Sequence, residues 1–324
     1  MPMTRTPKTV MVTGVGAIIG YGVIRALRQC GTPVRIIGLD IFSDAVGQHW
    51  CDAFRQAPLT SHPEYLPFIH DMVRAFQVDL IIPGIEQDVS FWANHVSEMA
   101  DMNAQVVLNP PELITLADDK WITHQALVQK QFATIPTVIE GTFESLSQQW
   151  GVPFLIKPRR SYASKGIERV FSEADFNYWH QRLGDNFMAQ QRVGSDEDEY
   201  TCAVFGDGQG RMLAHICFRR TLSGEGSTAK AEVVFNTDLT ERLIQLTQAF
   251  QPQGPCNFQF RKHQGEFLLL EINPRISSST SLRTLFGYNE AQLCLDFYLH
   301  QREIFQPAVQ AGKAVRYIED VLLA

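Results

Sequence analysis

Short apolar runs alternate with amphipathic segments over the first third of the chain, and this alternation limits the possible folds most strongly. Thr9–Thr13 and Val34–Leu39 are apolar runs rich in β-branched residues, and the segment 20–30 between them carries apolar residues at helical spacing. Helical and strand patterns then alternate over 65–76, 80–82, 87–100 and 105–108. Such alternation predicts a mostly parallel sheet with helices on both faces, ending near residue 115.

The pattern changes after Pro110 and Pro111. From Pro153 onward, period-2 runs and Gly-rich turns dominate, and the runs lie at 154–158, 187–193, 199–205 and 211–220. A helical pattern at about 239–250 separates them from the last strands. We therefore expect an antiparallel α+β region in the second part of the chain. With 324 residues, the chain is long enough for two or three packed units.

Charge and cysteine usage narrow the classes of function. Lys and Arg number 28 against 35 Asp and Glu, a net charge of −7, so we expect neither nucleic acid nor an anionic membrane as partner. No apolar stretch reaches the roughly 18 residues of a membrane span, and we expect no signal peptide. The six cysteines form no Cys-x-x-Cys pair, which predicts core cysteines and a cytoplasmic location.

A Gly-rich turn at Gly14–Gly20 follows the first predicted strand, and Asp40 ends the second. Backbone N–H groups of such a turn can bind a phosphate, and Asp40 could hold a ribose, as in a dinucleotide site. The spacing is Gly-x-Gly-x-x-x-Gly, however, with Ile19 where the dinucleotide motif has Gly or Ala. A tight strand-to-helix turn explains the same residues, and both interpretations stay open.

Polar residues alternate with apolar ones in the segment 256–275. If Gln264 and Gly265 turn this segment into a hairpin with an odd-length loop, the odd-numbered positions share one face. The side chains that would then converge are Gln259, Glu271, Asn273 and Arg275. The first three offer oxygen ligands with one formal charge, which suits Mg²⁺ when a phosphate supplies further ligands. The alternative is an ordinary amphipathic hairpin with a solvated polar face.

Three cations lie at or next to a Gly/Ser-rich connection at 223–232. Arg219 and Arg220 precede it, and Lys230 lies within it. Cations at this place would suit a carboxylate or an acyl phosphate, since one Arg can bind two oxygens at once. An exposed hairpin loop is the alternative interpretation.

Several short motifs occur in one order along the chain, and together they carry a resemblance. They are Asp119-Lys120, the PFLIKP run with Lys157, Ser164-Lys165-Gly166-Ile167, the AQQRV run before Glu199-Tyr200, Asn257-Phe258-Gln259-Phe260, and Glu271-Ile272-Asn273-Pro274-Arg275. In this order they resemble the ATP-grasp superfamily, with the closest likeness to its carbamoyl phosphate synthetase-like carboxylate–amine ligases. The likeness covers nearly the whole chain, because that family's preceding domain opens with a Gly-rich turn.

The resemblance implies a fold in three parts. A Rossmann-like α/β pre-ATP-grasp domain would cover residues 1–115. An α+β ATP-grasp fold would follow, with lobe A over 116–186 and lobe B, including a C-terminal helix, over 187–324.

The resemblance also implies where ATP binds. Lys120 and Lys157 would contact the triphosphate, and the loop 159–167 would cover it. The loop would contribute Ser164, Lys165 and Gly166, although Tyr162 and Ala163 stand where relatives often have further glycines. The adenine would lie against Gln190, Gln191 and Val193, with Gln190 where many relatives have Glu. Glu199, or its neighbour Glu197, would hold the ribose.

The same resemblance implies the reacting centre. Gln259, Glu271 and Asn273 would hold two Mg²⁺ or Mn²⁺ ions, while Lys157 and Arg275 would act in catalysis, with Arg275 stabilising an oxyanion. Ser277 and Ser278 would help to hold the acceptor, unless this serine run only caps a helix.

The implied activity is that of an ATP-dependent carboxylate–amine ligase. ATP would phosphorylate a carboxylate, and an amine would attack the acyl phosphate to give an amide or peptide bond, ADP and phosphate. The partners would be these small molecules, and the protein would be a homodimer like many relatives. Two alternatives remain: an NAD(P)-dependent oxidoreductase or epimerase that uses Gly14–Gly20, and an ATP-binding regulatory protein without turnover.

Overall fold

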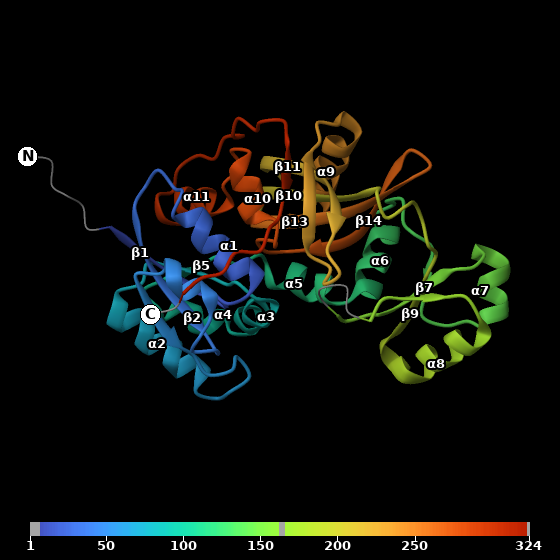
Figure 1. The fold of residues 1–324 in the computed structure, drawn as a ribbon, viewed down its shortest axis with the longest axis horizontal. Helices are drawn as coiled ribbons and strands as arrows, with labels where there is room; N and C mark the ends of the chain where they lie inside the picture. Colours follow the sequence, from blue (N-terminus) through green and yellow to red (C-terminus); the bar gives the residue numbers. More distant parts are fainter. Residues whose placement is uncertain (1–6, 162–165, 323–324) are drawn as a thin grey trace, which may run out of the picture.

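The computed structural model describes residues 7–161 and 166–322, and its strands form three sheets (Figure 1). The first sheet is parallel throughout, with strand order β3-β2-β1-β4-β5. Its strands are β1 (Lys8–Thr13), β2 (Val34–Asp40), β3 (Ala53–Gln56), β4 (Leu80–Ile82) and β5 (Gln105–Val106). Its helices are α1 (Ile18–Leu27), α2 (Tyr65–Phe76), α3 (Glu86–Asn94) and α4 (Val96–Ala100), with a 3₁₀ turn at Val46–Trp50.

The parallel sheet confirms the alternation read from the sequence, with two differences. The helix expected over 87–100 is two helices, because His95 leaves helical geometry with φ −126° and ψ 40°. The strand β3 was not expected, since its four residues are half-buried or exposed and show no apolar run.

A four-stranded antiparallel sheet follows, with order β6-β9-β7-β8. Its strands are β6 (Thr137–Val138), β7 (Phe154–Pro158), β8 (Glu168–Val170) and β9 (Phe187–Gln190). Helices α7 (Phe143–Trp150) and α8 (Glu173–Leu183) bury Leu146 and Phe176 against Phe154 and Ile156 of β7. A 3₁₀ turn at Gly184–Asn186 leads into β9, so this sheet extends past the expected lobe boundary at residue 186.

A six-stranded antiparallel sheet makes up most of the remainder, with order β14-β13-β10-β11-β12-β15. Its strands are β10 (Glu199–Asp207), β11 (Met212–Leu222), β12 (Thr228–Val233), β13 (Gln253–His263), β14 (Glu266–Asn273) and β15 (Lys313–Val315). Helix α9 (Thr237–Phe250) covers one face, while α10 (Thr280–Leu285), α11 (Glu290–Cys294) and a π-helical turn at Leu295–Leu299 cover the other. Helices α5 (Pro111–Asp118) and α6 (Lys120–Gln129) connect the parallel sheet to the four-stranded sheet.

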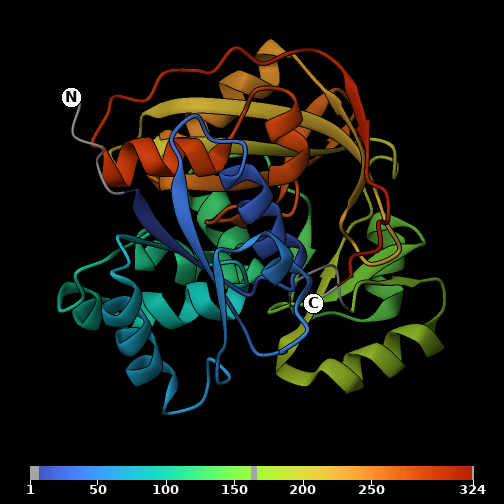
Figure 2. The same ribbon diagram turned by 60° about the vertical axis from the view of Figure 1, so that its left-hand side comes forward.

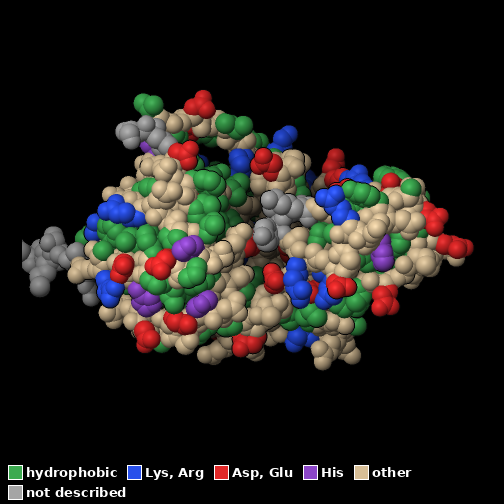
Figure 3. Space-filling model, turned by 90° about the horizontal axis from the view of Figure 1, so that it is seen from below, with side chains coloured by type: hydrophobic (Ala, Val, Ile, Leu, Met, Phe, Trp, Pro, Cys, Tyr) green, Lys and Arg blue, Asp and Glu red, His purple; other side chains and the backbone are tan. Residues whose placement is uncertain are grey.

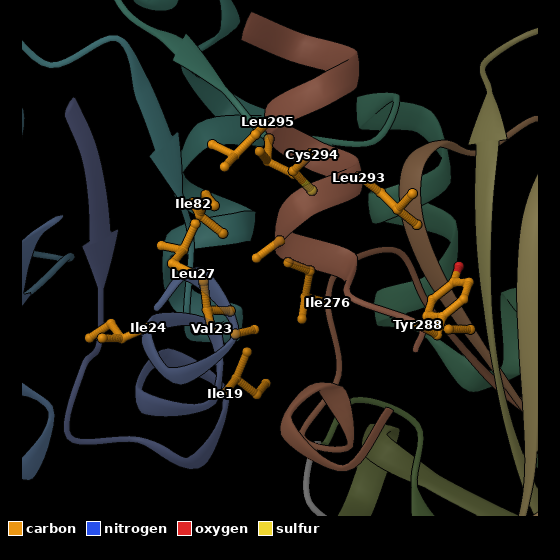
Figure 4. Close-up of a cluster of buried hydrophobic side chains, with 14 of the residues drawn as sticks. Ile19, Val23, Ile24, Leu27, Ile82, Ile276, Tyr288, Leu293, Cys294 and Leu295 are labelled. Carbon is orange, nitrogen blue, oxygen red and sulfur yellow. The ribbon is translucent and has the colours of Figure 1, made fainter. Parts of the chain in front are cut away.

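One apolar core joins the first unit to the C-terminal helices. Ile19 and Val23 of α1 pack in the same buried cluster as Ile276, Tyr288 and Leu295 (Figure 4). In a second view, the C-terminal helices lie between the parallel sheet and the six-stranded sheet (Figure 2). The parallel-sheet unit and the six-stranded sheet with its C-terminal helices are therefore packed together through one core.

The surface agrees with the net charge of −7. On the face shown in Figure 3, Lys and Arg side chains are scattered among Asp and Glu and do not form one broad basic patch. Within residues 7–161 and 166–322, each helix is too short or too polar to cross a membrane.

The β13–β14 hairpin brings the expected polar face together, although our reason for expecting it was wrong. The turn has two residues, Gln264 and Gly265, both with positive φ, and it pairs His263 with Glu266. This register alone would place odd positions opposite even ones. A β-bulge adjacent to Gln259 shifts the register by one, so Gln259 lies opposite Glu271 and Asn257 opposite Asn273.

A buried ion pair connects the six-stranded sheet to the C-terminal helices. Arg283 of α10 and Glu290 of α11 are both fully buried, with a nitrogen–oxygen distance of 3.2 Å. Arg283 also donates to Asn257 Oδ1 at 2.5 Å, and Thr201 donates to the same oxygen at 2.7 Å. Because Arg283 is fully buried, its charge is balanced by the Glu290 carboxylate and by hydrogen bonds within the protein.

Glu290→Gln is expected to destabilise the protein by about 3 kcal/mol, because it leaves the buried Arg283 charge without its counter-ion. Urea unfolding followed by circular dichroism measures this. The exposed Glu303→Gln is the control and should change stability by less than about 0.5 kcal/mol. Equal stability of the two variants would show that the ion pair does not contribute as argued.

Candidate functional site

Lys157 lies on β7 and is only 5% exposed. Burial, followed by repulsion from Lys120, lowers the pKa of Lys157 to about 8, while Glu271 and Glu199 oppose this shift. The two expected phosphate ligands, Lys120 and Lys157, therefore lie in one region with the expected metal ligand Glu271. Lys120 begins α6, and its Nζ donates to the Ser161 carbonyl at 2.7 Å.

A narrow cavity lies between the two antiparallel sheets. Its polar lining residues include Lys120, Lys157 and Gln190, with Thr123, His124 and Thr134. Its apolar walls come from both sides, with Met188 on β9 and Leu269 on β14. Lysines beside an apolar slot are the combination that a base and its phosphates require.

The residues expected at the adenine lie along β9 and the segment after it. Gln190 is buried, and its amide donates to Thr137 Oγ1 at 2.9 Å, which leaves its side-chain oxygen available as an acceptor. The Gln191 N–H donates to the Pro136 carbonyl at 2.9 Å. Val193 is buried against Ile135.

Glu199 is held between two arginines. Its carboxylate accepts from Arg220 at 2.7 Å and from Arg261 at 2.8 Å, and it is 4% exposed. Arg220 also donates to Gln259 Oε1 at 2.8 Å. The competing residue Glu197 is exposed. Glu199 therefore lies beside Gln259 in one ion-pair network, and its contact with a ribose stays a prediction.

The polar face of the hairpin leads to the N-terminal unit through Arg275. Its guanidinium donates to Asn273 Oδ1 at 3.0 Å and also pairs with Glu86 at the start of α3. A second small cavity is lined by Glu86, Ser161 and the segment Glu271–Arg275. The expected catalytic arginine thus lies where the parallel-sheet unit meets β14.

Other expected residues lie at the edge of this region or outside it. Arg219 is turned away and pairs with Glu232 at 2.9 Å, and Lys230 is exposed on β12. Ser277 is buried, and the Ser278 carbonyl accepts from Arg316 at 2.8 Å. Ser279, which precedes α10, makes no side-chain cap bond, whereas Ser277 Oγ accepts from the Ser279 N–H at 3.3 Å just before the helix.

The loop after β7 is described only in part. Ser164 and Lys165, like Tyr162 and Ala163, lie outside the described residues. Gly166 has φ +76°, and a Cβ there would meet Pro158 Cγ at 2.9 Å, so this position requires glycine.

Two charged residues of the site were missed. Arg261 pairs with Glu199, and period-2 alternation from Gln259 could have placed it on the same face. Glu86 pairs with Arg275 from 189 positions away, and no local pattern indicates that contact.

The oxygen donors on β13 and β14 fit a hard divalent cation. Within the described ranges, the Glu271 side chain makes no hydrogen bond, while the side-chain oxygens of Gln259 and Asn273 each accept from one arginine and keep a second lone pair. The buried Asn273 Nδ2 also lacks a partner there. One carboxylate and two amide oxygens suit magnesium with phosphate as co-ligand. The same described ranges hold no cluster of three or more His, Cys, Asp and Glu suited to a metal.

The turn at Gly14–Gly20 is filled by the protein itself. Asp40 Oδ2 accepts from the Gly16 N–H at 2.7 Å, and Oδ1 accepts from the Phe42 N–H at 3.0 Å. In a dinucleotide site, amides of this turn would face the pyrophosphate. A Cβ at Gly20 would lie 2.1 Å from the Gly14 carbonyl oxygen, so close packing explains this glycine. These contacts favour the tight-turn interpretation.

Comparison with known sequences gives a family and distant relatives. A family described as "ATP-grasp in the biosynthetic pathway with Ter operon" matches residues 193–321. The carbamoyl phosphate synthase large chain of Methanosarcina acetivorans is 22% identical over 319 residues, which cover 87% of this chain and 29% of that protein. The N-terminal section of the Methanopyrus kandleri large chain is 21% identical and covers 90% of this chain and 57% of its own length. This chain therefore spans only part of these relatives.

Solved structures with the same fold include a synthetase, a carboxylase and a ligase. N5-carboxyaminoimidazole synthetase from Staphylococcus aureus, complexed with ADP, has a TM-score of 0.74 at 16% identity and covers 93% of this chain and 80% of its own. Biotin carboxylase from Campylobacter jejuni has a TM-score of 0.70 at 17% identity, with 90% and 70% covered. L-amino acid ligase from Bacillus licheniformis has a TM-score of 0.68 at 16% identity, with 91% and 75% covered.

Residues 193–321 thus match an ATP-grasp family, and the chain as a whole is similar in sequence to carbamoyl phosphate synthase large chains and in fold to N5-carboxyaminoimidazole synthetase.

Proposed function

We propose that this protein is an ATP-dependent carboxylate–amine ligase that forms an amide or peptide bond through an acyl phosphate. One observation carries the proposal: the buried Lys157 of the four-stranded sheet lies within electrostatic reach of Glu271 and Glu199 on the six-stranded sheet, across a cavity whose other wall is Leu269 and Leu270 of β14. The names of the relatives support it, since they include carbamoyl phosphate synthases and an L-amino acid ligase. Residues 1–115 would act as the Rossmann-like pre-ATP-grasp domain.

The residues of the site have separate tasks in this proposal. Lys120 and Lys157 hold the phosphates, because compact ammonium groups balance their charge. Gln259, Glu271 and Asn273 hold magnesium, which supplies further neutralisation of the phosphate charge when bound. Gln190, Gln191 and Val193 contact adenine, and Glu199 contacts the ribose.

The reaction consists of two displacements. A carboxylate oxygen attacks the γ-phosphorus of ATP, and the bond to the ADP oxygen breaks. The amine nitrogen then attacks the carbonyl carbon of the acyl phosphate, loses a proton, and inorganic phosphate leaves. Arg275 stabilises the oxyanion of the second step, since its guanidinium donates fixed N–H bonds beside the metal-binding face. The protein's own contribution is positioning and charge neutralisation, without a covalent protein intermediate.

Calorimetric titration tests the nucleotide class. ATP with Mg²⁺ is expected to bind, and NAD⁺, NADH, NADP⁺ and NADPH are not. Binding of ATP should be lost in Lys157→Ala and Glu271→Ala and retained in the control Lys313→Ala, whose side chain is 75% exposed. Nicotinamide binding without ATP binding would contradict the proposal.

Turnover separates a ligase from a regulatory ATP-binding protein. Sustained release of ADP over many turnovers is expected only when suitable carboxylates and amines are both present. Tight ATP binding with no ADP release across a broad panel would contradict the ligase activity. The cytoplasmic location stays a prediction that cell fractionation can check. The homodimer stays a prediction that sedimentation can check.

A further inference from the structure

A cavity of about 880 Å³ lies at the carboxyl edge of the parallel sheet. The turns after β1 and β2, the loop 57–61 and helix α3 surround it. Small-molecule sites commonly occupy this edge of an open parallel sheet and enclose about 300–1,000 Å³. The cavity is therefore of a size and in a position suited to a ligand.

The lining of this cavity is mainly apolar and remains open to solvent at one side. Three large hydrophobic side chains at its rim are unusually exposed: Ile41 at 36%, Phe42 at 63% and Leu59 at 57%. Phe91 and Ile85 of the α3 region line it as well. Exposed apolar side chains gathered at one concave place favour an apolar ligand body.

Three carboxyl groups line the cavity, those of Asp40, Asp44 and Asp88. The titratable base in its lining is His95, and no described Lys or Arg lines it. Asp88 is 2% exposed and accepts from Thr60 at 2.7 Å and from Tyr65 at 2.8 Å. Burial raises the pKa of the Asp88 carboxyl, whereas an ammonium group beside it would favour its charged form. The carboxyl groups of this lining thus attract a cation and repel a phosphate or a carboxylate. The aromatic rings at the rim can also contact an ammonium group.

The cavity adjoins the candidate active site. Ser90 of α3 borders both the large cavity and the small one that contains Glu271, Asn273 and Arg275. Glu86 of the same helix pairs with Arg275. A ligand held beside α3 thus lies next to the proposed reacting centre.

We propose that this cavity binds the amine substrate, and that this substrate is an amine with an apolar body of aromatic-ring size and no phosphate. That this ligand is a substrate rests on the proposed ligase function. The existence of the site and the class of its ligand depend only on the cavity and its lining. A dinucleotide is disfavoured here, since Asp40 already accepts from the Gly16 amide.

Calorimetry on the full chain tests the ligand class with three probes of known chemistry. The probes are 2-phenylethylamine, 3-phenylpropionate and inorganic phosphate. Binding of the amine is expected, with the carboxylate at least tenfold weaker and phosphate not detected at this site. Stronger binding of the carboxylate or phosphate than of the amine would overturn the proposal.

Variants place the amine in the cavity. Phe42→Ala and Leu59→Ala change exposed side chains and should each weaken amine binding about tenfold without affecting the fold. Asp88→Asn should weaken it further, while the exposed Asp185→Asn should not change it. Undiminished binding in both Phe42→Ala and Leu59→Ala would place the amine elsewhere and overturn the proposal.

ATP binding, measured on the same samples, keeps the two proposals apart. Lys157→Ala should lose ATP binding and keep amine binding. If the amine binds but ATP does not bind even to the wild-type chain, the cavity is a ligand site and the ligase function fails. If ATP binds but no amine does, the ligase function stands and the assignment of this cavity fails.

Discussion

Glu271→Gln is expected to lower the ATP-dependent rate by about 10³-fold and to leave the fold intact. Glu271 is the one charged member of the oxygen set on β13 and β14, and it lies opposite Gln259 across the bulged hairpin. The amide keeps the shape and removes the charge that a divalent cation requires. Measuring ADP release over a range of Mg²⁺ concentrations reports both the rate and the metal requirement.

The same strand offers a matched control. Glu266 lies on β14 at the hairpin end and is exposed, so Glu266→Gln removes the same charge far from the cavity. It should leave the rate within about twofold. A Glu271→Gln variant as active as Glu266→Gln at every Mg²⁺ concentration would remove Glu271 from the metal site.

Lys157→Met is expected to lower kcat/KM for ATP by about 10³-fold, because it removes a buried ammonium from the phosphate site. The wild type should also lose activity as pH rises. Burial lowers the pKa of Lys157 to about 8, so the charged amine disappears above that pH in the free enzyme. The value of kcat/KM should then fall about tenfold per pH unit.

Lys157→Arg is the informative second variant. A guanidinium stays charged throughout this range, so the variant should keep part of its activity and lose the decline above pH 8. A wild-type profile that stays flat to pH 10, or an unchanged decline in Lys157→Arg, would show that another group is responsible.

Stability should change with pH in the opposite direction. The pKa of Lys157 is lower in the folded chain than its ordinary value of 10.5, so the unfolded chain binds the proton more tightly. This cost is fully present below pH 8 and decreases as pH rises toward 10.5, by at most about 1.4 kcal/mol per pH unit. The Lys157→Met protein should lack this increase in the free energy of unfolding.

Elements with strong periodicity were predictable from the sequence, and most short edge strands were not. The helix at 65–76 and the strands at 80–82 and 154–158 have the expected ends. The strands β3, β6, β8 and β15 have two to four residues and lie at sheet edges. Their pairing is decided by the neighbouring strand rather than by their own side chains.

The part of the candidate site that lies on the β13–β14 hairpin was predictable from the sequence. Gln259 lies opposite Glu271 only because of a β-bulge, which the sequence pattern of the turn did not indicate. The two-residue turn alone would give a register shifted by one residue. The pair of Arg275 with Glu86 joins distant segments. Such contacts follow from packing of the whole chain, which no local pattern contains.

The shared core of α1 with the C-terminal helices also limits how the protein can be recombined. Ile19 and Val23 bury apolar surface that belongs equally to Ile276 and Leu295. A chimera that exchanges the first 115 residues for those of a relative would place two surfaces together that have not adapted to each other. Grafting new specificity into this protein therefore requires that the first unit and the helices after residue 276 be transplanted as a matched pair.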